Sequence, residues 1–356
     1  MDSRRESTSS YRLDVVSRHV CCADTNVQRF NVAVLGGAGG IGQPLCLLLK
    51  QSPVCCRYMK ELRVYDVANT AGVVADLSHI DTDVCVSSHT GPEALTSALY
   101  GADLVIIPAG VPRKPGMTRD DLFKINAGIV KTLVEGVVAC CPKAWIAIIS
   151  NPVNSTVPIT SALCKQAGVY NDARVFGVTT LDVIRANAFV GQALGINPRR
   201  VSVPVVGGHA GQTILPLLSA CVPQIGPKIS MKERNALVTR IQNAGTEVVE
   251  AKAGTGSATL SMAYAAKEFA TSCLKAMAGE QGIVECAYVA STLFKDVPFF
   301  SSPVRLGRDG IAEFVGGDWF KRMTPTEKDG LQKMLPELSQ SIQKGLDFVN
   351  DTRKTM

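Results

Sequence analysis

The sequence predicts an α/β protein in which a doubly wound parallel sheet is followed by a mixed α+β domain. Three observations support this prediction. A strand pattern, a glycine-rich turn and a helical stretch follow one another from residue 31, and buried-strand patterns then alternate with helical stretches up to residue 150. After residue 177, long amphipathic stretches replace this alternation, with short strand-like runs around residues 284–289 and 304. We therefore expect one domain over residues 30–177 and a second over residues 178–352.

The composition indicates a globular protein without a membrane-spanning segment. The chain has 356 residues, of which 46% are apolar and 19% are charged, enough for two domains of ordinary size. No stretch approaches the roughly 18 uninterrupted apolar residues that a membrane helix needs. The Lys and Arg residues that give the net charge of +6 are scattered among 31 acidic residues and form no basic run. We expect neither a nucleic-acid nor a membrane partner, and an anionic small molecule explains the positive charge equally well.

The twelve cysteines do not form a metal-binding or disulfide pattern. They occur as adjacent pairs or singly inside apolar runs, and never as C-x-x-C. We expect reduced thiols in a reducing compartment and no metal site.

Residues 1–29 read as a presequence that is disordered or cleaved. They are rich in Ser and Arg and lack the apolar core of a secretory signal. Arg12-Leu13 and His19-Val20, separated by five residues, resemble the N-terminal peroxisomal targeting signal. On a helix these pairs share one face, which an import receptor could bind through residues 12–20. We expect a peroxisomal or glyoxysomal location; a mitochondrial or plastid presequence, or chance in a disordered tail, are the alternatives.

The first strand and turn have the pattern of a Rossmann dinucleotide site. The apolar run over residues 31–35 leads into a turn with Gly36, Gly39 and Gly42, and a helical stretch begins at Gln43. Gly36 permits the tight turn, Gly39 lets the backbone approach a pyrophosphate, and Gly42 allows close packing of helix on strand. The helix N-terminus then offers free N–H groups to the phosphates.

Asp66 predicts which dinucleotide binds. It ends the second strand pattern, residues 62–66, about where a Rossmann unit places its ribose ligand. A carboxylate at this point repels the 2′-phosphate of NADP, so the expected cofactor is NAD. The alternative role for Asp66 is that of a helix N-cap.

Two further strand patterns extend the parallel sheet. They cover residues 103–107 and 145–149 and are separated by a helical stretch over residues 121–139. The polar turn after the second of them contains Asn151, at the strand end where ligands of open α/β sheets bind. Asn151 is therefore a candidate ligand of the substrate or the nicotinamide.

Several motifs together resemble the malate dehydrogenase family. They are residues 36–44 (GGAGGIGQP), 109–119 (AGVPRKPGMTR), 149–154 (ISNPVN), 180–185 (TLDVIR) and 205–211 (VVGGHAG). The resemblance spans residues 30 to 350 and is strongest to the mitochondrial and glyoxysomal branch of this lactate/malate dehydrogenase superfamily. It implies reversible NAD-dependent oxidation of (S)-malate to oxaloacetate, and a homodimer built on helices around residues 42–52 and 179–194.

His209 is the candidate acid–base residue. Hydride transfer between carbon and nicotinamide requires a proton to move on or off the substrate oxygen, and imidazole titrates near neutrality. His209 lies in a glycine-rich turn after an apolar run. By resemblance, Asp182 is its partner, which fixes the imidazole tautomer and stabilises the imidazolium. The alternative is a structural histidine, the role we expect for His79 and His89.

Three arginines are candidate ligands of the substrate. Arg185 follows Asp182 by three residues on one helical face, and the family assigns it to the C1 carboxylate; an ordinary surface ion pair is the alternative. Arg113 and Arg119 lie in a Pro- and Gly-containing loop suited to act as a lid. A second carboxylate needs its own cation, and lactate dehydrogenases commonly have Gln at the position matching Arg113. Arg119 would polarise the carbonyl or hold a carboxylate.

The resemblance also implies further cofactor contacts. Met262 matches a position that packs near the nicotinamide, where it could shape the hydride site without adding a charge; by periodicity alone it would be a core residue. The other cofactor-binding residues that the family pattern implies are Ile41, Asn126, Ile149 and Asn151.

Two alternative functions remain open. The nearest is another 2-hydroxy-acid dehydrogenase, such as a lactate dehydrogenase, which would differ mainly at Arg113. The other is a non-catalytic NAD-binding or redox-sensing protein, suggested by the many cysteines. Such a protein has no need for three arginines together with a His–Asp pair.

Overall fold

The computed structural model describes residues 27–111 and 119–354. The proposed targeting segment, residues 12–20, and Arg113 therefore lie outside the described residues. Arg119 is described only as the first residue of a helix, without its side chain.

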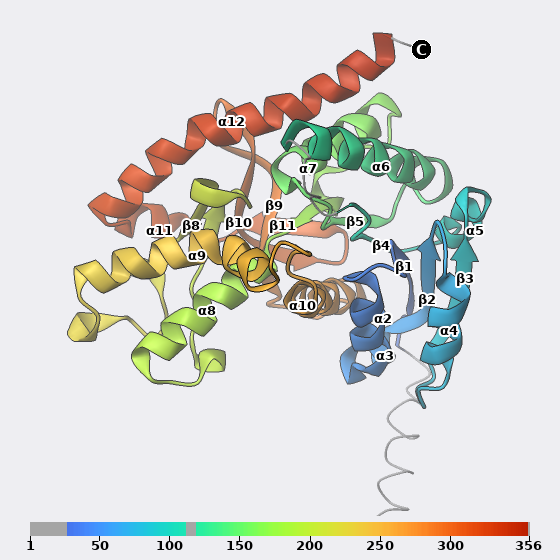
Figure 1. Ribbon diagram of the computed structural model, residues 1–356, viewed down its shortest axis with the longest axis horizontal. Helices are drawn as coiled ribbons and strands as arrows, with labels where there is room; N and C mark the ends of the chain where they lie inside the picture. The colour runs from blue at the N-terminus through green and yellow to red at the C-terminus, as the bar shows by residue number, and fades with distance from the viewer. Residues whose placement is uncertain (1–26, 112–118, 355–356) are drawn as a thin grey trace, which may run out of the picture.

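The described part of the chain forms one 11-stranded mixed sheet with helices on both faces (Figure 1). Its first six strands are parallel and lie in the order β3-β2-β1-β4-β5-β6. This is the strand order of a Rossmann fold and confirms the predicted doubly wound sheet. The strands are β1 (Phe30–Leu35), β2 (Met59–Asp66), β3 (Cys85–Thr90), β4 (Leu104–Ile107), β5 (Trp145–Ile148) and β6 (Val175–Val178).

Helices connect these strands and cover the sheet on both faces, the first three on one face and the next three on the other. They are α2 (Gly42–Gln51), α3 (Pro53–Tyr58), α4 (Thr70–Ser78), α5 (Leu95–Leu99), α6 (Arg119–Cys140) and α7 (Val153–Gln166). Alternate residues of β1 enter different cores because successive strand side chains point to opposite faces. Val32 and Val34 pack in one cluster with Phe269, whereas Ala33 and Leu35 pack in a second cluster with residues of α6 and α7.

The second half continues the same sheet with antiparallel strands. Strand β9 pairs with β6, and the order runs on through β10, β7 and β8, with β11 on β10. The strands are β7 (Val205–Gly207), β8 (Ile214–Pro216), β9 (Val284–Phe294), β10 (Val297–Gly307) and β11 (Gly310–Phe314). The short strands expected near residues 284–289 and 304 are in fact a hairpin of two 11-residue strands. Ser291 and Thr292 end the apolar run of β9, and Ser301, Ser302 and two prolines interrupt that of β10, so the pattern alone does not show the full length of the hairpin.

Five helices complete the second half. They are α8 (Thr180–Leu194), α9 (Met231–Ala251), α10 (Leu260–Ala278), α11 (Gly317–Arg322) and α12 (Pro325–Lys354). The segments α8, β7, β8 and α9 share a separate core cluster. Helix α12 crosses the top of the view in Figure 1 and packs on α7 and β10, with Met334, Leu338 and Ile342 buried.

The start of α12 shows the capping box that its sequence pattern predicts. The Thr324 N–H donates to Glu327 Oε2 at 2.8 Å, and the Glu327 N–H donates to Thr324 Oγ1 at 3.2 Å. Glu327 Oε1 also accepts from the Ser219 N–H at 2.9 Å. The cap therefore ties α12 to the segment that follows β8.

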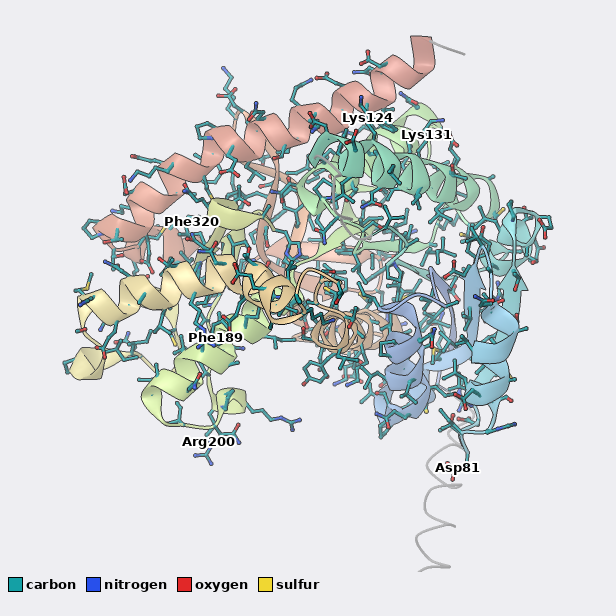
Figure 2. The ribbon with its side chains drawn as sticks, viewed as in Figure 1. Asp81, Lys124, Lys131, Phe189, Arg200 and Phe320 are labelled. Atoms are coloured by element: carbon teal, nitrogen blue, oxygen red, sulfur yellow. The ribbon has the colours of Figure 1, made fainter. Side chains whose placement is uncertain are left out.

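Charged side chains are scattered over the described surface. Asp81, Lys124 and Arg200 are exposed at three separate edges of the molecule (Figure 2). None of the described helices is long and apolar enough to cross a bilayer. Among the residues placed by the structure, no group of His, Cys, Asp and Glu could hold a metal ion.

The described cysteines are free thiols, and most are buried. Burial raises the pKa of Cys46 and of Cys286 to about 12. A thiol with such a pKa remains protonated and unreactive at neutral pH.

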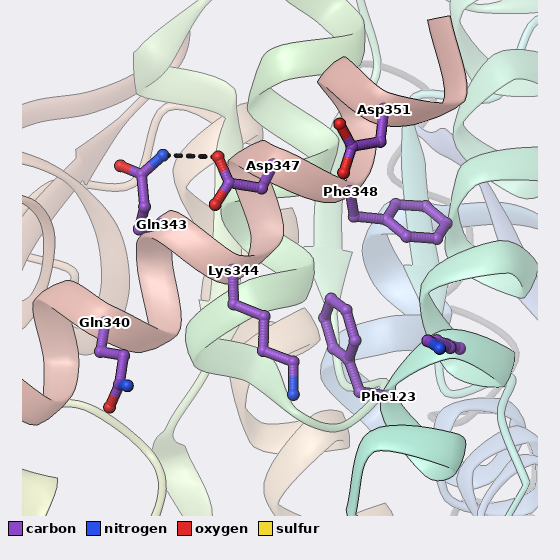
Figure 3. A pocket seen from close by; sticks show the side chains of 8 residues that line it. Phe123, Gln340, Gln343, Lys344, Asp347, Phe348 and Asp351 are labelled. Atoms are coloured by element: carbon purple, nitrogen blue, oxygen red, sulfur yellow. Dashed lines mark hydrogen bonds between the residues drawn. The ribbon is translucent and has the colours of Figure 1, made fainter. Parts of the chain in front are cut away.

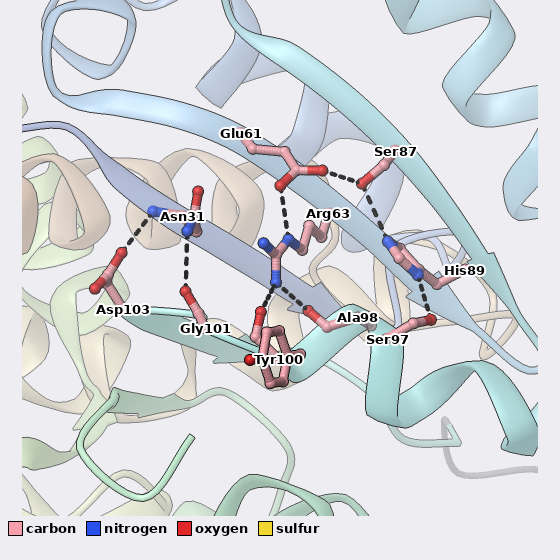
Figure 4. Close-up of polar contacts among 10 residues, drawn as sticks. All are labelled: Asn31, Glu61, Arg63, Ser87, His89, Ser97, Ala98, Tyr100, Gly101 and Asp103. Carbon is pink, nitrogen blue, oxygen red and sulfur yellow. Dashed lines mark hydrogen bonds and ion pairs between the residues drawn. The ribbon is translucent and has the colours of Figure 1, made fainter. Parts of the chain in front are cut away.

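His89 is held in a polar network on β2 and β3 (Figure 4). Its Nδ1 lies 2.9 Å from Ser97 Oγ and its Nε2 lies 3.1 Å from Ser87 Oγ. Burial, with a contribution from Arg63, lowers its pKa. Both ring nitrogens are thus occupied, as expected of a structural histidine.

Candidate active site

The candidate site residues lie at the carboxyl ends of the parallel strands. The glycine turn follows β1, Asp66 ends β2, Asn151 follows β5, and Asp182 lies in the first turn of the helix that follows β6. Strand order reverses between β1 and β4, and ligands of doubly wound sheets bind at such a point. The topology therefore gathers at one edge the residues predicted separately along the chain.

The glycine turn, residues 36–42, is packed so tightly that a Cβ would overlap a neighbour at Gly36, Gly37 and Gly42. Gly36 has φ +104°, and a Cβ there would lie 2.7 Å from the Ala109 backbone. A Cβ on Gly42 would lie 2.1 Å from Gly36 O, whereas one on Gly39 would meet only Gly36 O, at 3.3 Å. Gly42 is thus required by contact with the turn itself, rather than by helix-on-strand packing. Gly39 is open to an approaching ligand.

The N-terminus of α2 has no side-chain cap. Ile41 occupies the N-cap position without a side-chain hydrogen bond, and the first turn contains no acidic residue. Pro44 has no N–H and the Gln43 N–H donates to Gly39 O at 3.0 Å, so the N–H groups left for a ligand at the start of the helix are those of Ile41 and Gly42. These donors, together with the positive end of the helix dipole, suit a pyrophosphate.

Asp66 lies directly against the glycine turn. Its Oδ2 accepts from the Ala38 N–H at 3.0 Å and its Oδ1 accepts from the Val67 N–H at 2.8 Å. Helix α4 has Asn69 at its N-cap, so the alternative role of Asp66 as an N-cap is wrong. Each carboxylate oxygen keeps a lone pair that can accept from a ribose hydroxyl.

Asn126 joins the two loops that flank the site. Its side chain is 2% exposed, its Oδ1 accepts from the Val111 N–H at 2.9 Å, and its Nδ2 donates to Asn151 O at 2.9 Å. Asn151 is exposed and precedes a cis peptide bond to Pro152, while Ile149 is buried. The side chain of Asn151 is therefore free to face a ligand, and Asn126 supports the backbone behind it.

Folding brings Asp182 and His209 together across 27 residues. His209 Nδ1 lies 2.5 Å from Asp182 Oδ2, and the Asp182 side chain is fully buried. The bond to Nδ1 leaves Nε2 as the ring nitrogen available to a substrate. The His209 side chain retains 10% exposure, so it remains within reach of a ligand.

Arg185 lies beside this pair. Its NH1 is 3.9 Å from Asp182 Oδ1, and Asp182 Oδ1 is buried with no hydrogen-bond partner in the described structure. Because Asp182 is fully buried, the alternative of an ordinary surface ion pair is wrong. Burial lowers the pKa of Arg185, and the nearby Asp182 opposes this effect. Arg185 thus keeps donors free for an incoming anion.

Two residues that the sequence analysis did not single out also contact the histidine turn, residues 207–213. The His209 N–H donates to Asn154 Oδ1 at 2.8 Å, and Asn154 Nδ2 donates to Thr213 Oγ1 at 3.2 Å. Asn154 occurs in the polar turn after β5, where ligand-binding residues were expected, so its position indicated a role in the site. No feature of the sequence indicated Thr213. Met262 is 5% exposed and belongs to the core cluster of the α2 face.

A surface hollow between α6 and α12 contains none of the predicted site residues (Figure 3). Phe123 and Phe348 meet there edge to face, with ring centroids 5.9 Å apart. Lys344 Nζ lies 4.5 Å above the Phe123 ring and pairs with Asp120. The hollow is a gap between two helices held by these contacts, and it lacks the acid–base chemistry of the His209 site.

Comparisons with known proteins agree with this arrangement. The lactate/malate dehydrogenase NAD binding domain matches residues 30–177, and the lactate/malate dehydrogenase alpha/beta C-terminal domain matches residues 179–349. Glyoxysomal malate dehydrogenase of Oryza sativa subsp. japonica is 57% identical, covering 93% of this chain and 90% of that protein. Mitochondrial malate dehydrogenase of Sus scrofa is 54% identical over 90% of this chain and 92% of its own length. The crystal structure of Cryptosporidium parvum malate dehydrogenase superposes with a TM-score of 0.74 at 29% identity, covering 91% of this chain and 100% of that one.

Proposed function

Because the chain belongs to the lactate/malate dehydrogenase family, we propose that it catalyses the reversible NAD-dependent oxidation of (S)-malate to oxaloacetate. It is an NAD-dependent oxidoreductase, as its relatives are. The observation that carries the proposal is the buried Asp182–His209 hydrogen bond with Arg185 beside it. This set supplies one acid–base group and one cation for a carboxylate.

His209 moves the proton at Nε2. In malate oxidation the neutral imidazole accepts the C2 hydroxyl proton, and in oxaloacetate reduction the imidazolium returns it. Asp182 accepts from Nδ1–H, which fixes the tautomer and stabilises the cation that forms. NAD, when bound, takes up the hydride that leaves C2.

The residues of the glycine turn fit such a dinucleotide. The uncapped start of α2 offers N–H groups to the pyrophosphate. Because Gly36 has no Cβ, the turn can pack closely against the backbone of Ala109. Asp66 would hold the adenosine ribose and exclude NADP. The full proposed cofactor set is Gly36, Gly39, Ile41, Gly42, Asp66, Asn126, Ile149, Asn151 and Met262.

Arginines select a substrate with two carboxylates. Arg185 would hold the C1 carboxylate by a two-point contact. Arg113 would hold the second carboxylate, and Arg119 would polarise the carbonyl or hold a carboxylate, while Asn151 would contact the substrate. A methyl group in place of that carboxylate would leave Arg113 without its counter-charge, which disfavours pyruvate.

We also propose the organisation of the chain around this site. Residues 30–177 would bind NAD and residues 178–352 would bind substrate, after a presequence over residues 1–29. Relatives named glyoxysomal or peroxisomal match the expected location, and relatives named mitochondrial match the alternative. Residues 12–20 would contact the peroxisomal import receptor. Two chains would pair through α2 and α8; Leu47 on α2 and Tyr264 on α10, which packs against both helices, are exposed apolar residues that support such a homodimer.

The test compares substrates and cofactors in one assay. NADH oxidation is followed with oxaloacetate and with pyruvate, and NADPH replaces NADH in a second series. We expect kcat/KM to favour oxaloacetate over pyruvate and NADH over NADPH. Arg113→Gln should shift the ratio toward pyruvate, whereas Arg200→Gln, at an exposed position outside the site, should not. Preference of the unmodified enzyme for pyruvate would contradict the substrate assignment, and absence of turnover with both would contradict the enzymatic role.

A further inference from the structure

The backbone of His209 is held by a side chain from the other half of the molecule. Its N–H donates to Asn154 Oδ1 at 2.8 Å across 55 residues of sequence. The Asn154 side chain is 2% exposed, and its Nδ2 donates to Thr213 Oγ1 at 3.2 Å. Both polar ends of this amide are therefore used inside the protein.

Thr213 closes the histidine turn from the other end. Its hydroxyl donates to Ala210 O at 2.7 Å and accepts from the Ala210 N–H at 3.1 Å. Thr213 is fully buried. Asn154 thus holds the N–H of His209, and Thr213 holds the N–H and the carbonyl of Ala210. The His209–Ala210 peptide cannot rotate without breaking one of these hydrogen bonds.

Two backbone hydrogen bonds also close the turn, from the Gly208 N–H to Thr213 O at 2.7 Å and from the Thr213 N–H to Ala210 O at 2.9 Å, but neither involves His209. Gly207 and Gly211 have positive φ values of 102° and 48°, and glycine is the most conformationally free residue. A Cβ on Gly208 would lie 2.5 Å from Thr213 Oγ1 and 2.8 Å from the Asn154 amide. Glycine at 208 therefore makes room for the two side chains, which then restrict the flexible turn.

Asn154 is itself fixed relative to Asn151, the candidate substrate ligand. It lies in the first turn of α7, three residues after Asn151, and its carbonyl accepts from the fully buried Tyr288 hydroxyl at 3.3 Å. Asp182 holds the imidazole through Nδ1. His209 is thus held at two points: at its ring by Asp182 and at its backbone by Asn154.

We propose that Asn154, supported by Thr213, is a positioning residue that sets the place of His209 Nε2 relative to the Asn151 loop. This inference rests on the proposed function, because it assigns His209 the proton-transfer step. Misplacement of a catalytic group by about 1 Å can reduce the rate by about 100-fold. Asn154 need not touch substrate or cofactor to have this effect.

The first test is Asn154→Ala with oxaloacetate and NADH. We expect kcat to fall by about 10- to 100-fold, while the KM for oxaloacetate and the Kd for NADH, measured by fluorescence titration, change by less than about threefold. The matched control is Asn187→Ala. Asn187 Oδ1 also accepts a backbone N–H, that of Val203 at 2.8 Å, but outside the histidine turn. The control should lower the thermal midpoint similarly and leave kcat unchanged.

Two further variants separate positioning from folding. Thr213→Val keeps the shape of the side chain but removes the hydroxyl that orients Asn154, so kcat should fall by a smaller factor and Thr213→Ser should restore it. Asn154→Asp keeps an acceptor for the His209 N–H but adds a negative charge near the imidazolium. The His209 pKa, measured by NMR of the imidazole protons, should therefore rise, and the pH profile should move with it.

The outcomes decide the proposal separately from the function. A thermal midpoint lowered as in Asn187→Ala, with kcat retained, would make Asn154 merely structural and overturn the proposal. A raised KM or NADH Kd with unchanged kcat would make it a binding residue, with the same consequence. If Asn154→Ala does not fold, the Thr213 pair and the NMR pKa decide. Absence of oxaloacetate turnover in the unmodified enzyme would instead overturn the proposed function, and the NMR shift would still report whether Asn154 faces His209.

Discussion

The two glycine-rich turns of the site differ in what their glycines make room for. In the glycine turn after β1, Gly36 and Gly42 approach backbone atoms, and the turn presents backbone N–H groups. In the histidine turn after β7, Gly208 approaches the side chains of Asn154 and Thr213, and the turn presents one imidazole. The first turn is held by hydrogen bonds to Tyr65 and Asp66 at the end of the adjacent strand of its own βαβ unit, whereas the second is held partly by Asn154 from the other half of the molecule. Cofactor binding thus depends on local backbone shape, whereas proton transfer depends on assembly of the whole fold.

The largest effect should follow removal of the imidazole from the histidine turn. His209→Asn keeps a polar side chain of similar size but cannot transfer the proton. We expect kcat for oxaloacetate reduction to fall by about 1,000-fold, while NADH still binds, because the glycine turn is independent of this residue. Steady-state rates and NADH fluorescence titration check the two parts. His79→Asn, at the exposed C-cap of α4, is the control and should retain activity. Loss of NADH binding in His209→Asn would show that the two turns are not independent.

The next effect separates two glycines within the glycine turn. A Cβ at Gly42 would overlap Gly36 O at 2.1 Å, so Gly42→Ala should destabilise the fold by about 1–3 kcal/mol. Gly39→Ala meets only Gly36 O at 3.3 Å and should cost less stability than Gly42→Ala, yet it should weaken NADH binding because Gly39 is exposed in the turn proposed to face the pyrophosphate. Thermal unfolding and NADH titration of both variants measure this difference. Equal loss of stability in both would mean that the whole turn is packed as one unit.

These contrasts explain which parts of the site the sequence could predict. The glycine turn and Asp66 lie within one βαβ unit, and their spacing alone indicates a dinucleotide site. No spacing rule joins Asp182 to His209 across 27 residues, and only the resemblance to a family paired them. The sequence does not indicate Thr213, because a buried hydroxyl that forms hydrogen bonds within a turn leaves no periodic pattern. The β9–β10 hairpin was underestimated for a different reason: Ser301, Ser302 and two prolines interrupt the apolar pattern of β10, although both serines are buried.

A smaller effect should test cofactor choice at Asp66. Asp66→Asn removes the negative charge but keeps an oxygen that can accept from the Ala38 N–H. We expect the preference for NADH over NADPH to fall by about tenfold, since the repulsion of the 2′-phosphate is lost while its binding is not created. The kcat/KM ratio of the two cofactors measures the change. An unchanged ratio would show that the exclusion of NADPH is steric and does not depend on this carboxylate.

The smallest effect concerns a carboxyl group that lacks the partners of Asp182. Asp182 has His209 and Arg185 beside it, whereas Glu285 on β9 accepts from the Ser272 hydroxyl at 2.6 Å and faces Glu268. Burial, with the charge of Glu268, raises the pKa of Glu285 to about 7.

The sign of the pH dependence follows from this raised pKa. Below the ordinary pKa of a glutamate, about 4.5, the group is protonated in both the folded and the unfolded chain and costs nothing. As the pH rises from there through about 7, the unfolded chain ionises first, so folding stability falls, and the cost is complete above that value. Glu285→Gln should therefore stabilise the protein by about 1 kcal/mol at pH values well above 7, since the partly exposed group keeps some hydration, and by much less at a pH near the ordinary pKa. Denaturant unfolding at the two pH values measures this, with the exposed Glu250→Gln as control. A gain that is equal at both values would mean that the variant improves packing and that Glu285 carries no buried charge.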